Sequence, residues 1–330
     1  MGKVRDAKFD TLKGWLILSV VFGHFFSHDA THSVPSEAIA NFIYSFHMPL
    51  FVFISGYFSS NQKVIRVGVR ILETYFVYQL IKGIWLDYSI LNLLIKPGPM
   101  LWYLFVLFFW RLIYAGMCRL GIKVTVYLII SIVVLSIIAG FVPWIGRKFA
   151  FSRFIFFAPY FFLGILAQRT NIIDAIKKRV SSRTALYIMF VTALISCFFA
   201  VYPIIRYRVT FAGVVPYPTN MQFVYMIARF FSYIISIIVS VAFLRLFSFE
   251  NKLFGTIGKD SLKYYMFHGI CLLGIETIGV PWSTFLAFAY AVAVTVTIFF
   301  FNKIKLSDFA ISPVSFVIKQ RKKIIINFNG

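Results

Sequence analysis

Long apolar segments alternate with short basic segments along the whole 330-residue chain. A helix that crosses about 30 Å of hydrocarbon needs about 20 mostly apolar residues, and this criterion predicts ten membrane-spanning helices. We expect them at 10–28, 40–59, 66–86, 99–116, 124–144, 151–168, 184–203, 222–246, 261–279 and 283–301. The third is the weakest, because charged side chains interrupt it. The pattern is typical of an all-α integral membrane protein.

The composition agrees with this pattern, since 60% of the residues are hydrophobic and only 13% are charged. Soluble globular domains carry far more charge. Because no polar block is long enough for a separate domain of about 50 residues, we expect residues 1–330 to form a single transmembrane domain with no appended soluble domain. The three cysteines have no close spacing, so they indicate neither a disulfide framework nor a zinc site.

The formal charge of +22 reflects membrane topology rather than nucleic-acid binding. The Lys and Arg residues lie in short clusters between apolar segments, as expected where charge sets the orientation of the helices. With ten spans, 25 of the 33 Lys and Arg residues fall on the side that holds both ends of the chain. We therefore predict that both termini are cytoplasmic.

The first span carries Lys13 and, eleven residues later, His24. This spacing is close to three turns, so both lie on nearly the same helix face with about 16 Å of rise between them. Asp10 lies one turn below Lys13 and can pair with it. His47 in the second span is expected at the same depth as His24. Two such histidines suggest a site, although a snorkelling lysine and two buried hydrogen-bonded histidines are the simpler alternatives.

A row of cations follows the second span: Lys63, Arg66 and Arg70, hereafter the basic row. Spacings of three and four residues place them along one side of a helix. Such a row can bind phosphates through charged hydrogen bonds, or it can be an ordinary positively charged cytoplasmic loop.

Five stretches resemble the membrane acyltransferase family 3. "RDAKFDTLKGWLILSVVFGH" is similar to its first span, which carries an Arg or Lys, ten residues and then a His, here Lys13 and His24. "FHMPLFVFISGYF", "RVGVR" and "PMLWYLFVLFFWRL" resemble its second span, its cytoplasmic arginine pair and its fourth span. "GKDSLKYYMFHG" is similar to a late span of the fucose 4-O-acetylase-like branch. Residues 120–250 match in hydropathy alone.

The resemblance implies O-acetylation of a polysaccharide of the cell envelope. An acyl group, usually acetyl, would move from cytoplasmic acyl-CoA to a hydroxyl of a cell-surface glycan or lipid-linked sugar, in a bacterial inner membrane. Acetyl-CoA would be a co-substrate, with no bound cofactor. No metal is expected, because a thioester is already activated and no third ligand accompanies the histidines.

The resemblance also implies residue roles. The basic row would hold the nucleotide phosphates, and Lys13 would meet the pantetheine arm or the thioester. His24 would be the general base for the sugar hydroxyl or would carry the acyl group transiently, and His47 would orient it.

Other residues are weaker candidates for the acceptor site or a channel. Asp10 is one of them. Counted along its span, His268 falls about half a bilayer below His24, which makes it a channel or structural residue. Trp102 and Tyr103 can stack on a sugar or belong to the aromatic belt at the membrane interface.

Five cations break the charge asymmetry, because the predicted topology puts them outside: Arg147, Lys148, Arg153, Arg206 and Arg208. They mark a surface for an anionic glycan or a lipid phosphate, or they are ordinary loop charges on a very basic chain.

Two other functions are compatible with the sequence. A transporter or flippase of lipid-linked sugars would use buried His and Lys as relays, but it would be expected to have repeated halves, and no convincing repeat is present. A membrane scaffold or sensor would need a partner-binding segment, and the cytoplasmic loops offer none.

The topology can be tested with single cysteines. Introduced as Ser181→Cys and Ser33→Cys in a chain without its native cysteines, they should react from opposite sides of the membrane. Labelling of both by an impermeant reagent in intact cells would rule out the ten-span arrangement.

Overall fold

The computed structural model describes residues 6–30, 33–59, 64–98, 100–214, 216–304, 306–313 and 315–317, and these residues form helices and connecting loops without a strand. The helices are α1 (Ala7–Asp29), α2 (Val34–Tyr44), α3 (His47–Tyr57), α4 (Val64–Trp85), α5 (Ile90–Ile95), α6 (Trp102–Arg119), α7 (Val126–Ala139), η2 (Lys148–Ala150), α8 (Phe151–Leu166), η3 (Ala167–Arg169), α9 (Ile172–Arg179), α10 (Ser182–Val201), α11 (Tyr207–Ala212), α12 (Gln222–Phe247), α13 (Lys252–Lys259), α14 (Ser261–Ile278), α15 (Thr284–Phe301) and α16 (Leu306–Ile311). The prediction of an all-α protein is therefore confirmed.

Each of the ten predicted spans contains a helix, and six segments of the described chain are long and apolar enough to cross a membrane. They are Ala7–Asp29, Val34–Tyr57, Lys148–Leu166, Ser182–Val201, Gln222–Phe247 and Thr284–Phe301. Of the other four helices, α7 has only 14 residues, and α4, α6 and α14 carry more polar side chains. The count of ten spans stays a prediction.

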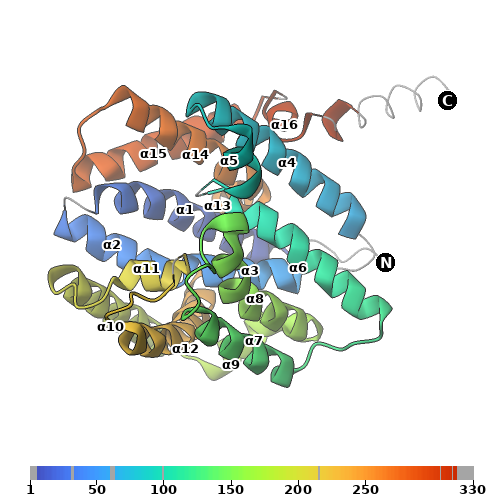
Figure 1. Ribbon diagram of the computed structural model, residues 1–330, viewed down its shortest axis with the longest axis vertical. Coiled ribbons are helices and arrows are strands. Elements are labelled where there is room, and N and C mark those ends of the chain that lie inside the picture. The colour runs from blue at the N-terminus through green and yellow to red at the C-terminus, as the bar shows by residue number, and fades with distance from the viewer. Residues whose placement is uncertain are drawn as a thin grey trace.

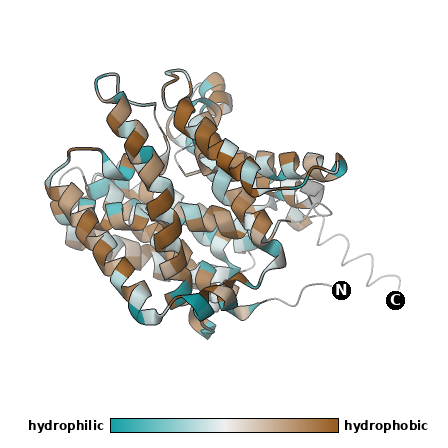
Figure 2. Ribbon diagram, turned by 90° about the horizontal axis from the view of Figure 1, so that it is seen from below, coloured by the Kyte–Doolittle hydropathy of each residue, from teal (hydrophilic) through white to brown (hydrophobic). Residues whose placement is uncertain are grey.

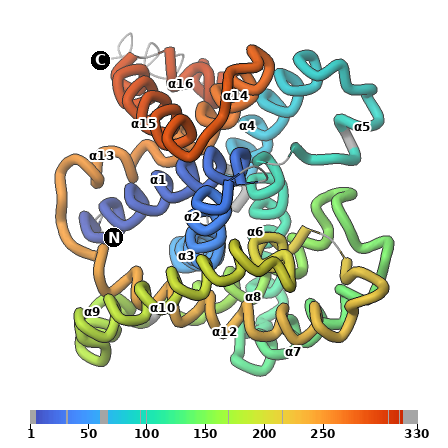
Figure 3. The backbone as a smooth tube through the Cα atoms, turned by 90° about the vertical axis from the view of Figure 1, so that its left-hand side faces the viewer, coloured from blue at the N-terminus to red at the C-terminus, as the bar shows by residue number. Residues whose placement is uncertain are grey.

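Helix α1 lies in the middle of the bundle (Figures 1 and 3). Helices α14 and α15 lie on one side of it, and α2, α3 and α12 lie on the other. Its side chains Leu16, Ile17 and Val20 are completely buried. A polar residue on such a helix has to find its hydrogen-bond partners within the protein.

The outer helices present apolar side chains outward. Leu186 and Phe190 on α10, Phe231 on α12 and Phe288 on α15 are each more than half exposed. Figure 2 shows long brown, hydrophobic stretches along many of the helices. Exposed apolar faces of this extent fit a lipid environment.

Three segments, namely the starts of α2, α11 and α15, come together at one end of the bundle. The Ser33 hydroxyl, before α2, hydrogen-bonds to Thr284 at the start of α15. Arg208 on α11 pairs with Glu37 on α2, at 3.3 Å between Nη2 and Oε2. We call this the Ser33 end.

A second group of segments meets elsewhere in the bundle. The amide of Asn251 donates to Thr11 Oγ1 at 3.1 Å. The Tyr57 hydroxyl donates to the carbonyl of Thr170 at 3.0 Å. All four residues lie in cytoplasmic loops or at the cytoplasmic ends of spans in the ten-span topology, whereas it places the residues of the Ser33 end at the outer side.

Helices α3 and α8 approach closely because each has a glycine at the contact. A β carbon on Gly56 would lie 2.0 Å from the carbonyl oxygen of Phe161, and one on Gly164 would lie 2.1 Å from that of Phe53. Small residues allow two membrane helices to pack backbone against backbone.

We therefore expect Gly56→Ala to destabilise the protein by about 1–3 kcal/mol or more, because the added methyl overlaps the backbone of α8. Gly274→Ala on α14 is the matched control, since a β carbon added there would have no neighbour within 4 Å. Thermal unfolding of the detergent-solubilised variants measures the difference. An equal effect of the two substitutions would contradict the close packing of α3 on α8.

Candidate active site

Three histidines from three helices meet near the centre of the bundle. His24 is on α1, His47 is the first residue of α3, and His268 is on α14. His24 Nδ1 and His268 Nε2 are 2.8 Å apart, and their rings are stacked with centroids 5.1 Å apart. The His47 ring is edge-on to His24 at 6.5 Å. The structure thus brings together His24 and His47, which were expected at the same depth, and places beside them His268, which was expected well below them.

A break in the second predicted span positions His47. Helix α2 ends at Tyr44, and α3 begins at His47. The carbonyl freed at Ser45 accepts a hydrogen bond of 2.7 Å from Ser236 on α12. His47 Nδ1 lies 2.8 Å from the carbonyl of Ile43, which can only accept, so Nδ1 carries a proton.

The same reasoning assigns the protons of the other two rings. His268 Nδ1 lies 2.8 Å from the Tyr264 carbonyl and therefore donates to it. In a neutral ring, this leaves His268 Nε2 as an acceptor. His24 Nδ1 must then donate to His268 Nε2, and His24 Nε2 keeps its lone pair. This hydrogen-bond chain, His24 to His268 to the Tyr264 carbonyl, is hereafter the histidine chain.

A cavity of about 260 Å³, the histidine cavity, is lined by His24 and His47, while His268 lies behind His24, outside the described lining. His24 is half-buried, whereas His47 and His268 are buried. The described lining residues are His24, Ser27, His28, Tyr44, His47, Met48, Met100, Trp102, Arg153, Phe157, Phe211, Ala212, Tyr265, Leu272 and Glu276. A ligand in this cavity can reach His24, and the nitrogen that is open to it is Nε2. Among the described residues, no group of three His, Cys, Asp or Glu side chains could hold a metal ion.

The expected depth of His268 is wrong. It does not lie half a bilayer below His24 but directly beside it. The reason is α13, which packs on the first turns of α1: a β carbon on Gly258 would lie 1.8 Å from the Asp10 carbonyl oxygen. Helix α14 follows at once, so the packing of α13 on α1, and not a membrane boundary, determines where α14 starts. Seven further residues then bring His268 level with His24.

The candidates near the start of α1 lie apart from the histidines. Lys13 Nζ is 3.4 Å from Asp10 Oδ1, as the spacing suggested, and 5.0 Å from the centre of the Phe58 ring. Asp10 is buried. Of the basic row, Arg70 is exposed on α4, while Lys63 and the side chain of Arg66 lie outside the described residues.

Trp102 and Tyr103, at the start of α6, have different surroundings. Trp102 lines the histidine cavity, with the Arg153 guanidinium 4.7 Å from its ring centre. Tyr103 lies outside the described lining and hydrogen-bonds to the Ser55 hydroxyl. Both are at least 95% buried, so they do not form an exposed aromatic belt.

Several lining residues were missed in the sequence. Tyr44 lies three residues before His47, and its ring centroid is 4.8 Å from that of His47. His28 is one turn beyond His24, and its Nδ1 lies 2.9 Å from Glu276 Oε1. Helical spacing could have indicated these residues, because Tyr44 is three residues from His47 and His28 is four residues from His24. Glu276 is eight residues from His268.

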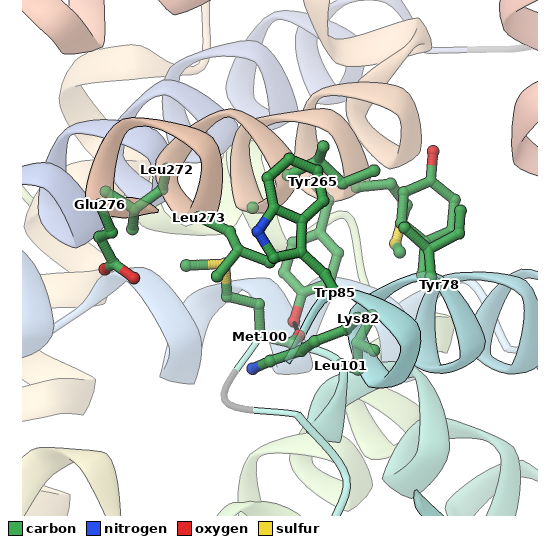
Figure 4. A pocket seen from close by; sticks show the side chains of 13 residues that line it. Tyr78, Lys82, Trp85, Met100, Leu101, Tyr265, Leu272, Leu273 and Glu276 are labelled. Carbon is green, nitrogen blue, oxygen red and sulfur yellow. Dashed lines mark hydrogen bonds between the residues drawn. The ribbon is translucent and has the colours of Figure 1, made fainter. Parts of the chain in front are cut away.

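A smaller cavity of about 160 Å³ lies between α4 and α14 (Figure 4). Its described lining is mostly apolar, with Lys82 and Glu276 as the charged groups, and it contains no histidine. It shares four residues with the histidine cavity: Met100, Tyr265, Leu272 and Glu276. This apolar cavity is thus a neighbour of the candidate active site.

In a comparison with protein families, the family model Acyl_transf_3, described as an acyltransferase domain, matches residues 6–302. The matched region includes all three histidines. Among curated proteins and solved structures, none matches the chain significantly.

Proposed function

Because the chain belongs to acyltransferase family 3, we propose that it is an O-acyltransferase that moves an acyl group, most simply acetyl, from cytoplasmic acyl-CoA to a hydroxyl of a cell-surface or lipid-linked glycan. Family membership and the long apolar helices make it a multi-pass membrane protein. The observation that carries the proposal is the histidine chain, which leaves His24 Nε2 as a base beside a cavity. A bacterial inner membrane is the proposed location.

The proposed reaction uses His24 Nε2 as a general base. It takes the proton of the acceptor hydroxyl as that oxygen attacks the carbonyl carbon of the thioester. The bond from this carbon to sulfur then breaks, and CoA leaves as a thiolate that takes the proton back from the imidazolium. In a two-step transfer, the same nitrogen would carry the acyl group between donor and acceptor.

His268 supports this role by fixing the orientation of His24. Its Nε2 accepts the Nδ1 proton of His24 at 2.8 Å, both before and after Nε2 of His24 is protonated. The imidazolium formed during the reaction therefore keeps a hydrogen-bond partner inside the protein. His47 offers its own unprotonated Nε2 to the same cavity, where it can accept a hydrogen bond from a second sugar hydroxyl.

The donor is proposed to approach from the end of the bundle where α1 begins. Lys13 lies on this path, eleven residues before His24 on nearly the same face of α1. The basic row follows α3, and its exposed member Arg70 can meet a phosphate. Cationic side chains at this end suit the nucleotide part of acyl-CoA.

The proposal predicts that His24→Ala abolishes transfer without abolishing donor binding. Loss of a positioned base should lower the rate of acceptor acetylation by about 10²–10⁴. Donor binding should be retained, because acetyl-CoA binding does not need the imidazole. Lys13→Ala should instead weaken use of the donor, and Lys13→Arg should be milder because it keeps the charge. Transfer of labelled acetyl from acetyl-CoA to an isolated cell-envelope glycan fraction measures these effects.

Membrane abundance and acetyl-CoA binding are measured on the same preparations, so that misfolding is not read as lost catalysis. An abundant His24→Ala protein that acetylates at nearly the wild-type rate would refute the role of His24. Absence of any acetyl transfer by the wild-type protein, with donor and several glycan fractions supplied, would contradict the proposed function itself.

A further inference from the structure

A second chamber adjoins the histidine cavity and is lined by four arginines. It measures about 390 Å³ and lies at the Ser33 end of the bundle. Arg147 precedes η2, Arg153 is in the first turn of α8, and Arg206 and Arg208 lie at the start of α11. None of the described residues that line it is Asp or Glu. We call it the arginine chamber.

The positive charge of this chamber is only partly compensated within the protein. Arg208 Nη2 lies 3.3 Å from Glu37 Oε2, and Arg208 also donates to the Ser27 carbonyl at 2.9 Å. Arg147 and Arg206 are exposed. Because the arginines outnumber the one glutamate that pairs with them among the described contacts, this concave site carries net positive charge and attracts anions.

The chamber is also fixed in shape. The Ser152 hydroxyl donates to the Gly213 carbonyl at 2.7 Å, which ties the start of α8 to the end of α11. Between Arg147 and Arg153 the chain adopts the left-handed conformation at Phe149 and Ala150, each with φ of 51°. Non-glycine residues keep this conformation only where their surroundings require it.

The arginine chamber is continuous with the histidine cavity. The two share five lining residues: Ser27, Tyr44, Trp102, Arg153 and Ala212. A ligand whose anionic group lies among the arginines would therefore extend toward His24. The forked guanidinium donors of arginine match the two oxygens of a carboxylate or a phosphate.

We propose that the arginine chamber binds an anionic group of the acceptor, so that the acceptor is an acidic sugar. The anion, a carboxylate or a phosphate covalently attached to the sugar, lies among the arginines while a neighbouring hydroxyl faces His24 Nε2. This inference rests on the proposed function, because the bound sugar is an acyl acceptor only if the protein transfers an acyl group to a glycan. The binding of the anionic sugar, however, needs no acyl donor and can be measured separately.

The experiment uses the full-length protein in phosphatidylcholine nanodiscs and isothermal titration calorimetry with three probes: glucuronate, glucose 1-phosphate and methyl glucoside. At least one anionic sugar should bind ten times more tightly than methyl glucoside, and salt should weaken this binding. Arg147→Gln and Arg206→Gln should each lower its affinity about tenfold or more. Lys148→Gln is the matched control, because Lys148 is an exposed neighbour outside the described lining; it should bind like wild type. A preference for glucuronate or for glucose 1-phosphate identifies the anion.

Equal binding of all three sugars, or unchanged affinity in both arginine variants, would overturn the proposal. Tighter binding of inorganic phosphate than of either anionic sugar would also overturn it, because that result indicates a site for free phosphate. Loss of sugar binding in phosphatidylglycerol nanodiscs would overturn it as well, because that result indicates a site for a lipid headgroup. A negative result in these binding measurements would not change the acetyl transfer measured with the wild-type protein, so the two proposals can fail separately.

Discussion

The hydrogen bond between His24 and His268 determines which nitrogen of His24 can take part in chemistry. The Tyr264 carbonyl can only accept, so it fixes the proton on His268 Nδ1, and this in turn fixes the proton of His24 on the side of His268. One main-chain carbonyl on α14 thereby sets the state of a ring on α1. The arrangement needs no charged partner, which is costly to bury in the middle of a membrane protein.

The helices around this bond hold α1 and α14 so that His24 and His268 lie at the same level. The glycine contact between α1 and α13 fixes the point along α1 from which α14 starts. The break between α2 and α3 turns His47 toward the same point, and Ser236 on α12 satisfies the carbonyl that the break exposes. The break between α2 and α3 thus has a polar partner for its free carbonyl and places the His47 ring at the cavity.

Much of the fold could be predicted from the sequence, because long apolar segments have few alternatives to a membrane helix. The pairing of Asp10 with Lys13 and the proximity of His24 to His47 also followed from helical geometry. The position of His268 did not. Counting residues from an assumed boundary treats each helix as straight and independent, whereas α13 and its glycine shift the start of α14.

The arginine chamber shows a second limit of the sequence. Arg147, Arg153, Arg206 and Arg208 stood out as exceptions to the charge asymmetry, but they come from two segments more than 50 residues apart. Only the tertiary structure shows that they surround one chamber, and that this chamber opens into the cavity beside His24.

The most direct test of this account is the protonation state of His24. Nitrogen-15 NMR of histidine-labelled full-length protein in nanodiscs, with the His24 signals assigned by their loss in His24→Ala, distinguishes the two ring nitrogens. At neutral pH the account predicts a protonated Nδ1 and an unprotonated Nε2, and it predicts that His268→Phe removes this preference. A His24 ring protonated at Nε2 with a bare Nδ1 would contradict the histidine chain and the role of His24 as a base.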